Sequence, residues 1–366
     1  MLIYVRISEM LKARVDDLIS CGHYSDFNAV VTVALENLLV AEEEAGSPRK
    51  SPPQKRSLPA PASAPSEQSV PPPPPPQPAE LPSVTQWTTP PALAEKFFAP
   101  LPPDLFLPGQ RVPVERWVFG QQNRVMPAKV NARLLITLVA ERQGELELFE
   151  AAAEISKRSV AIFTFLHDLD QRFGHGKDDL LSTGFPEPGS EKAISRYANH
   201  FAAYESTQGN LTGMLIQWKL AGIRRVKNKT YLLPTRACLD FAALPNPLLD
   251  HPATQKPTQK FSADETAWAI NHISHNVPVE AAAFTTILAG LSAGATTPDA
   301  LDAFVRENAR EKDDVSPAFV STQRSGAVSR MADLSLVRRQ RDGTKVSYET
   351  TELGAKWLRS QGESRS

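Results

Sequence analysis

A long proline-rich stretch divides the sequence and limits what it can fold into. The 366-residue chain has 32 prolines, six of them consecutive at residues 71–76, and residues 47–92 are rich in Pro, Ser, Ala and Gln. Such a stretch cannot bury enough apolar surface to offset the entropy lost on ordering. We therefore predict a disordered or polyproline-like linker at residues 47–92, between folded parts at residues 1–46 and 93–366.

The overall composition is that of a globular protein. Hydrophobic residues make up 41% and charged residues 22% of the chain, and no apolar run reaches the roughly 18 residues of a membrane span. Cys21 and Cys238 have no paired spacing, which favours a reducing compartment and argues against a disulfide framework or a zinc site. We expect a cytoplasmic protein without membrane contact. Because the net charge is -1, any affinity for nucleic acid must come from local patches.

The first 46 residues are periodic but too few to form a core alone. Isoleucine or valine occupies every second position between residues 2 and 8, which predicts a half-buried strand. Ser8 and Ser25 can each cap a helix, and Gly22 ends the first of these two helices. One strand and two short helices bury a sufficient core only when two chains intertwine and pair their strands as an antiparallel ribbon.

This pattern resembles the ribbon-helix-helix repressors of the CopG, Arc and MetJ type. The resemblance covers residues 2–41 and rests on the strand, on the turn between the helices and on residues 31–37 of the second helix. It implies a homodimer through residues 1–46 whose paired strands enter the major groove of DNA. The alternative is that this module only dimerises the chain, because it carries eight acidic residues against three basic ones. The side chains implied to contact DNA are Tyr4 and Arg6 on the strand and Ser25, Phe27 and Asn28 at the start of the second helix.

Residues 93–366 have the composition of a folded region, which we divide into domains at residues 93–250 and 251–366. Two β-hairpins are predicted from their turns at residues 227–229 and 342–343, and each is followed by a short helical run, at residues 237–244 and 353–358. The predicted fold class is therefore mainly α. Helical periodicity predicts amphipathic or buried helices at residues 131–143, 145–169, 191–205, 263–274 and 279–291.

A weak internal repeat connects these hairpins. Residues 206–225 and residues 321–339 both begin with Ser-Thr-Gln and end with a double arginine, and each predicts a helix of about three turns before a basic hairpin. This order resembles the winged helix-turn-helix domains of bacterial regulators such as the MarR type. In the second copy the resemblance makes residues 321–332 the recognition helix and residues 336–350 the wing. The C-terminal region would then hold one or two winged-helix-like units.

Both copies are rich in basic residues. Residues 206–239 contain no Asp or Glu, and residues 321–345 contain six basic residues against two acidic ones. Cations on a helix and wing would bind phosphates, whereas Gln, Asn and Arg can read base edges. The alternatives are a solvated basic face or a winged domain that contacts protein. The candidate DNA contacts are Gln208, Asn210, Lys219, Arg224, Arg225, Lys227 and Lys229 in the first copy and Gln323, Arg324, Arg330, Arg338, Arg339, Arg341 and Lys345 in the second.

The sequence contains no motif that indicates catalysis. It lacks a phosphate-binding glycine loop, a zinc-protease motif and a nucleophile elbow, and His272 and His275 have no third metal ligand nearby. We expect no catalytic residue, metal or cofactor. We predict a dimeric, sequence-specific DNA-binding protein, a transcriptional regulator whose partners are double-stranded DNA and a possible protein partner of the C-terminal domain. The alternatives are a dimeric adaptor of a mobile-element, plasmid-maintenance or defence assembly, and a plasmid replication or partition factor with tandem winged domains.

Overall fold

The computed structural model describes residues 95–103, 106, 110–176, 179–250, 256–257, 259–308 and 315–363. The chain divides into two units, residues 1–79 and 80–366, and every described residue belongs to the second unit. This described part is mainly helical with small antiparallel sheets, which confirms the mainly α prediction for it. The predicted ribbon-helix-helix dimer, the predicted linker and the candidate contacts Tyr4, Arg6, Ser25, Phe27 and Asn28 lie outside the described residues.

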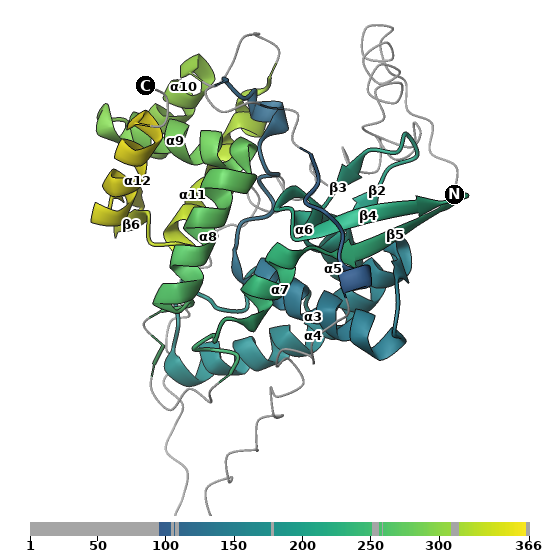
Figure 1. Cartoon of the computed structure of the whole chain (residues 1–366). Helices are drawn as coiled ribbons and strands as arrows, with labels where there is room; N and C mark the ends of the chain where they lie inside the picture. Colours follow the sequence, from purple (N-terminus) through teal and green to yellow (C-terminus); the bar gives the residue numbers. More distant parts are fainter. Residues whose placement is uncertain are drawn as a thin grey trace, which may run out of the picture. The chain divides into compact units, whose positions relative to one another are not determined.

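The first half of the described residues combines two long helices with a three-stranded sheet (Figure 1). Its helices are η2 (Glu95–Phe97), η3 (Val114–Arg116), α3 (Met126–Arg142), α4 (Leu148–Phe173), α5 (Glu191–Tyr197), the π-helical η4 (Ala198–Ala202), α6 (Met214–Gln217) and α7 (Arg236–Ala243). Its strands are β1 (Leu146–Glu147), β2 (Tyr204–Glu205), β3 (Leu211–Thr212), β4 (Ala221–Val226) and β5 (Lys229–Pro234). The sheet has the order β1-β5-β4, and β2 pairs with β3 separately.

The second half contains five helices and one hairpin within the residues that the structure describes. These are α8 (Ala263–Asn276), α9 (Pro278–Ser292), α10 (Pro298–Asn308), α11 (Pro317–Asp333), β6 (Val337–Asp342), β7 (Lys345–Thr350) and α12 (Glu352–Glu363). Local signals explain where they begin. The side chain of Ser262 accepts a hydrogen bond from the backbone of Glu265, whose carboxylate accepts one from Ser262, and this capping box starts α8. Pro278 occupies the first turn of α9.

The predicted helices and hairpins are present with shifted ends. The five predicted helices correspond to α3, α4, α5 with η4, α8 and α9, and the two predicted hairpins are β4–β5 and β6–β7. The helix predicted at residues 191–205 ends earlier, because Ala203 adopts an extended conformation before β2. The hairpins close through left-handed residues at their turns, Lys227 with φ 55° and Gly343 with φ 59°.

The internal repeat is present in the structure at a constant spacing of 116 residues. Strand β6 begins at Val337, 116 residues after β4 begins at Ala221, and β7 follows β5 at the same spacing. The residue after each hairpin is a threonine whose hydroxyl binds the two carbonyls just before the first strand. Thr235 Oγ1 lies 2.9 Å from the carbonyl oxygens of Lys219 and Leu220, and Thr351 Oγ1 lies 2.6 and 3.1 Å from those of Ser335 and Leu336.

This spacing corrects the predicted alignment of the repeat in two ways. The double arginine Arg224-Arg225 is equivalent to Gln340-Arg341 rather than to Arg338-Arg339. The first copy also lacks the predicted three-turn helix, since residues 206–210 form the turn between β2 and β3 and α6 has only four residues. Gly213 explains the difference. Its φ is 102°, and a Cβ there would lie 2.7 Å from Ala203 Cα, so no continuous helix passes through it.

The two halves share one hydrophobic core and buried ion pairs, whereas the sequence predicted a domain boundary after residue 250. Lys129 on α3 lies 3.0 Å from Glu265 on α8, and neither side chain is exposed. His272 Nε2 on α8 is 2.8 Å from the carbonyl oxygen of Trp218 in the first half. If the halves separated, Lys129 and Glu265 would lose their ion-pair partners and the carbonyl of Trp218 would lose its hydrogen bond. The two halves therefore stabilise each other.

The buried Lys129 predicts that stability increases at alkaline pH. Burial lowers the pKa of Lys129 from 10.5 to about 8, although Glu265 opposes this shift. Between about pH 8 and 10.5 the unfolded chain holds this proton and the folded protein has released it, so the unfolding free energy rises with pH. Relative to a Lys129→Met, Glu265→Gln double variant, the unmodified chain should gain up to roughly 3 kcal/mol across this window. Urea unfolding at pH 7.5 and pH 10 measures it; a difference that stays constant with pH would contradict it.

Candidate nucleic-acid interface

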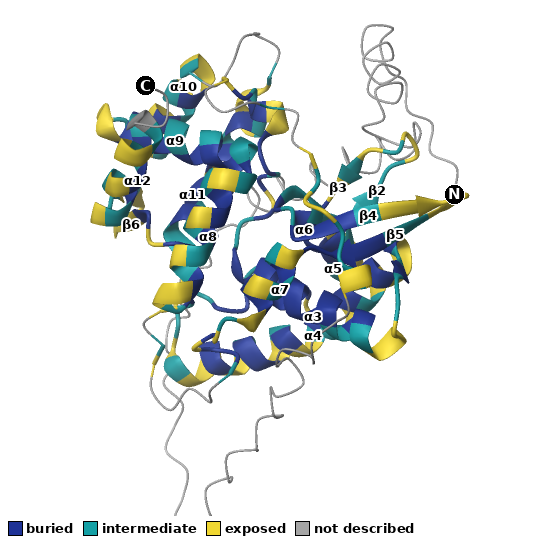
Figure 2. Cartoon of the chain, viewed as in Figure 1, coloured by how far each residue is buried: buried dark blue, intermediate teal, exposed yellow. Residues whose placement is uncertain are grey.

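The basic side chains of both hairpins are exposed. The hairpin β4–β5, whose exposed tip is visible in Figure 2, carries four of the predicted contacts, and the hairpin β6–β7 carries four more. These two sets of cations are the first requirement for binding a polyanion. They are Arg224, Arg225, Lys227 and Lys229 on the first hairpin and Arg338, Arg339, Arg341 and Lys345 on the second.

Acidic residues from other elements compensate the first hairpin. Arg224 pairs with Glu145, and the same side of the sheet places Glu147 2.8 Å from Lys229, where the hydrogen bond raises the pKa of this lysine. Arg225 Nη2 is 2.7 Å from Glu205 Oε1. These glutamates lie on or beside β1 and β2. The absence of acidic residues in residues 206–239 therefore does not make the folded surface strongly basic.

The second hairpin differs from the first because it carries acidic residues of its own. Its own acidic residues are Asp342 and Glu349, and Arg338 lies 3.5 Å from Glu349 with both side chains more than half exposed. An exposed pair of this kind is weak and remains open to competition from phosphate. The second hairpin itself therefore carries four exposed cations and two carboxylates, and phosphate can displace Glu349 from Arg338.

The structure buries three of the predicted DNA contacts on α11, which removes them from the surface. Gln323 is 1% exposed, and Arg324 is 6% exposed. Arg324 binds both carboxylate oxygens of Asp302, at 2.8 and 3.1 Å, and the hydroxyl of Tyr348 at 3.2 Å. Burial of these side chains follows from helical periodicity, because they lie on the faces of α11 that pack inside the protein.

Arg330, the third buried contact, connects the two halves. Its side chain is fully buried, with Nε 2.5 Å and Nη2 2.9 Å from the two carboxylate oxygens of Glu280 on α9. Its Nη1 also donates to the carbonyl oxygen of Gln122, at 2.5 Å, in the segment that precedes α3. The helix that the sequence identified as a recognition helix therefore uses one face to hold the halves together.

The remaining predicted contacts lie on loops rather than on a helix. Gln208 and Asn210 are exposed at the turn between β2 and β3, where the amide nitrogen of Asn210 is 3.3 Å from Gln208 Oε1. Lys219 is half-buried in the loop before β4 and has a left-handed backbone with φ 54°. These side chains consequently do not share a helical face with the cations of the first hairpin.

A groove of about 1070 Å³ separates α8 from α11, β6 and α12. One wall belongs to α8, and the opposite wall carries Ser325 and Ser329 of α11. The sequence analysis missed several of its cations, because they come from segments far apart in the chain and carry no local signal. The charged groups that line it are Arg124, Lys260, Arg338, Arg339, Arg341 and Lys356, with His275, Asp179 and Asp333.

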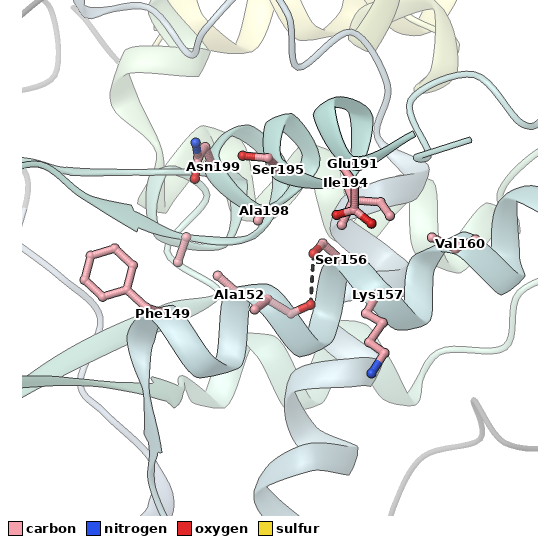
Figure 3. A pocket seen from close by; sticks show the side chains of 12 residues that line it. Phe149, Ala152, Ser156, Lys157, Val160, Glu191, Ile194, Ser195, Ala198 and Asn199 are labelled. Carbon is pink, nitrogen blue, oxygen red and sulfur yellow. Dashed lines mark hydrogen bonds between the residues drawn. The ribbon is translucent and has the colours of Figure 1, made fainter. Parts of the chain in front are cut away.

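A second cavity, of about 720 Å³, lies between α4 and the segment formed by α5 and η4 (Figure 3). Its lining is mostly apolar, and Phe149, which is 52% exposed, stands at one end of it. Ser156 in its wall donates to the carbonyl oxygen of Ala153 at 2.9 Å, so its hydroxyl is used within the helix. This surface suits an apolar contact rather than a polyanion.

Comparison of the chain with protein-family models, with curated proteins and with solved structures gave no match. Within the described residues, no group of three or more His, Cys, Asp or Glu side chains is arranged to hold a metal ion. None of the described helices has the combined length and apolarity that a membrane crossing requires.

Proposed function

We propose that the chain is a dimeric DNA-binding regulatory protein whose second hairpin, β6–β7, contacts the phosphate backbone of duplex DNA. The observation that carries this proposal is the four exposed cations of that hairpin, where Arg338 forms only a weak exposed pair with Glu349, whereas glutamates from other elements hold three of the four cations of the first hairpin. Exposed arginine and lysine side chains bind phosphates without reading sequence, and they set the position of a protein on the duplex.

The order of elements supports a winged-helix interpretation of this region. Helix α9 is followed by Thr296, whose carbonyl oxygen accepts a hydrogen bond of 2.8 Å from the backbone nitrogen of Tyr348 on β7. Helices α10 and α11, the hairpin and α12 then follow. The first half has an equivalent edge strand, β1, between α3 and α4 and beside β5, although α6 before its hairpin has only four residues. In the winged-helix resemblance, a hairpin at this position corresponds to the wing.

Sequence specificity is proposed for the N-terminal module rather than for α11. The side chains of α11 that line the groove are the small Ser325, Val328, Ser329 and Ala332 and the acidic Asp333, which Arg124 and Lys260 hold. Serine hydroxyls bind either kind of base and discriminate little between them. In the proposal, Tyr4 and Arg6 read the bases as part of a homodimer through residues 1–46. The second hairpin adds affinity through the raised effective concentration of a tethered module.

This proposal predicts how the salt dependence of DNA binding changes when the second hairpin is neutralised. An Arg338→Gln, Arg339→Gln, Arg341→Gln triple variant should bind a duplex at least about tenfold more weakly. The slope of log K against log salt should also fall by about 2 to 3, since each lost phosphate contact removes about 0.9. Fluorescence anisotropy of the full chain with a labelled duplex between 50 and 200 mM salt measures both quantities.

The first hairpin provides a matched control. An Arg224→Gln, Arg225→Gln, Lys229→Gln variant removes the same formal charge, but from cations that Glu145, Glu205 and Glu147 already hold, so few phosphate contacts are at stake. We expect its slope to change by less than about 1. Equal effects of the two triple variants, or none from either, would refute the assignment of DNA contact to the second hairpin.

The apolar cavity beside Phe149 favours a second candidate function, that of a dimeric adaptor that binds another protein through its helical region. An aromatic side chain that is half exposed at the end of an apolar groove is typical of a protein-contact surface. Under this candidate, Phe149→Asp abolishes biological function while duplex binding is retained. Under the DNA-binding proposal, neutralisation of the second hairpin reduces biological function more than Phe149→Asp does.

A further inference from the structure

We propose that the groove between α8, α11, β6 and α12 binds a single strand of nucleic acid, which adds a second nucleic-acid ligand to the proposed function on which this inference rests. The groove encloses about 1070 Å³, and its lining includes Val337, Arg338, Arg339 and Arg341 of β6, the first strand of the second hairpin. Three properties of this groove favour one strand over a duplex: its walls, its floor and its charges.

The walls keep a duplex away from α11. A recognition helix must stand free on the surface, because a major groove about 12 Å wide has to receive it along one side. Here Ser325 and Ser329 of α11 line the same groove as Ile270 and Ser274 of α8, so this side of α11 does not stand free. The neighbouring face of α11 is closed as well. A Cβ at Gly326 would lie 2.6 Å from Gly120 Cα, so the segment before α3 lies directly on the helix there.

The floor suits unstacked bases. Ile270 of α8 and Leu353 of α12, both half-buried, supply apolar surface at the groove, and the lining residues Phe261, Val328 and Trp357 are at most 4% exposed. The base faces in a duplex are stacked on one another, whereas those of a single strand are available to apolar and aromatic side chains. Hydroxyl and amide groups on α8, those of Thr266, Asn271 and Ser274, lie along the same groove and can bind base edges.

The charges suit a phosphodiester chain along one edge. Arg338, Arg339, Arg341 and Lys356 are exposed at the side formed by β6 and α12. Of the two acidic residues at the groove, Asp333 has a side chain only 2% exposed, and it is held by Arg124 at 3.4 Å and Lys260 at 3.1 Å. Its charge is thus compensated inside the protein. The other, Asp179, is exposed, and it sets the end of the groove from which phosphates are repelled.

Two sets of variants of the full chain separate the ligands. Asn271→Asp is an exposed change on α8, and Ser329→Asp is a half-buried change on α11; each adds negative charge inside the groove. Lys345→Gln changes the second hairpin at a position outside the groove lining. The probes are a labelled 12-nucleotide oligothymidine and a labelled 20-base-pair duplex, whose binding is measured by anisotropy at 100 mM salt.

We expect each groove variant to weaken oligothymidine binding by about tenfold and to leave duplex binding within about twofold. Lys345→Gln should instead weaken duplex binding and leave oligothymidine binding within about twofold. The exposed Asn271→Asp variant keeps the test valid if Ser329→Asp does not fold. Duplex binding without oligothymidine binding overturns this inference and leaves the proposed function standing. Equal losses for both probes, or oligothymidine binding that no groove variant changes, also overturn it. Failure to bind either probe refutes the proposed function itself.

Discussion

Replacement of Arg330 by Met is expected to destabilise the protein by about 3 to 5 kcal/mol. The guanidinium is fully buried and neutralises Glu280, whose side chain is also unexposed. It donates as well to the carbonyl oxygen of Gln122. Removal of one member of a buried ion pair leaves the other charge without compensation in a medium of low polarity, which costs far more than the loss of an exposed pair. Methionine has a similar length, so the change removes charge and hydrogen bonds with little loss of volume.

The unfolding free energy from urea denaturation at pH 7 measures this prediction, with a matched exposed arginine as the control. Arg338 also pairs with a glutamate, but its side chain is 68% exposed, and Arg338→Met should cost less than about 1 kcal/mol. An Arg330→Met, Glu280→Met double variant should be more stable than the Arg330→Met single variant, because no unpaired charge remains. A cost below about 1 kcal/mol for Arg330→Met would show that the buried pair and the hydrogen bond to Gln122 contribute little to stability.

Gly326→Ala is expected to destabilise the protein by about 3 kcal/mol or more, although alanine normally favours a helix over glycine by about 1 kcal/mol. A Cβ at this position would lie 2.6 Å from Gly120 Cα and would overlap its carbonyl oxygen. Both contacts are with backbone rather than with the flexible end of a side chain. To accommodate one methyl group, α11 and the segment before α3 would have to move apart, and the Arg330 hydrogen bonds in the same interface would lengthen.

The comparison for this substitution is Gly144→Ala, on the loop between α3 and β1. The nearest atom to a Cβ there is 3.9 Å away, and its φ does not lie in the left-handed region, so we expect a change within about 1 kcal/mol. Thermal and urea unfolding of both variants give the difference. If Gly326→Ala stabilises the protein as an ordinary helical substitution does, the backbone contact between the two halves is not maintained in solution.

The candidate site was predictable only in part. The turn chemistry of the hairpins and the concentration of Arg and Lys on them are local, so the exposed cations of β6–β7 could be identified from the chain alone. The compensation of β4–β5 could not, because Glu145 and Glu147 lie about 80 positions before the cations that they meet. Nor does any local pattern place Lys260 beside Arg338 in one groove.

The sequence by itself determined where the long helices α3, α4, α8 and α9 and both hairpins of the described region lie, but it did not predict α10. Apolar periodicity, capping residues and turn residues act over a few positions, so α3, α4, α8 and α9 and both hairpins follow from them with ends shifted by a few residues. Only the tertiary structure decided which faces of these elements meet. The sequence identified Arg330 as a basic residue but not as a buried one. It is a buried ion-pair partner because α9 and the segment before α3 surround it. Burial and charge compensation depend on residues distant in sequence, and for that reason they emerge only in the folded chain.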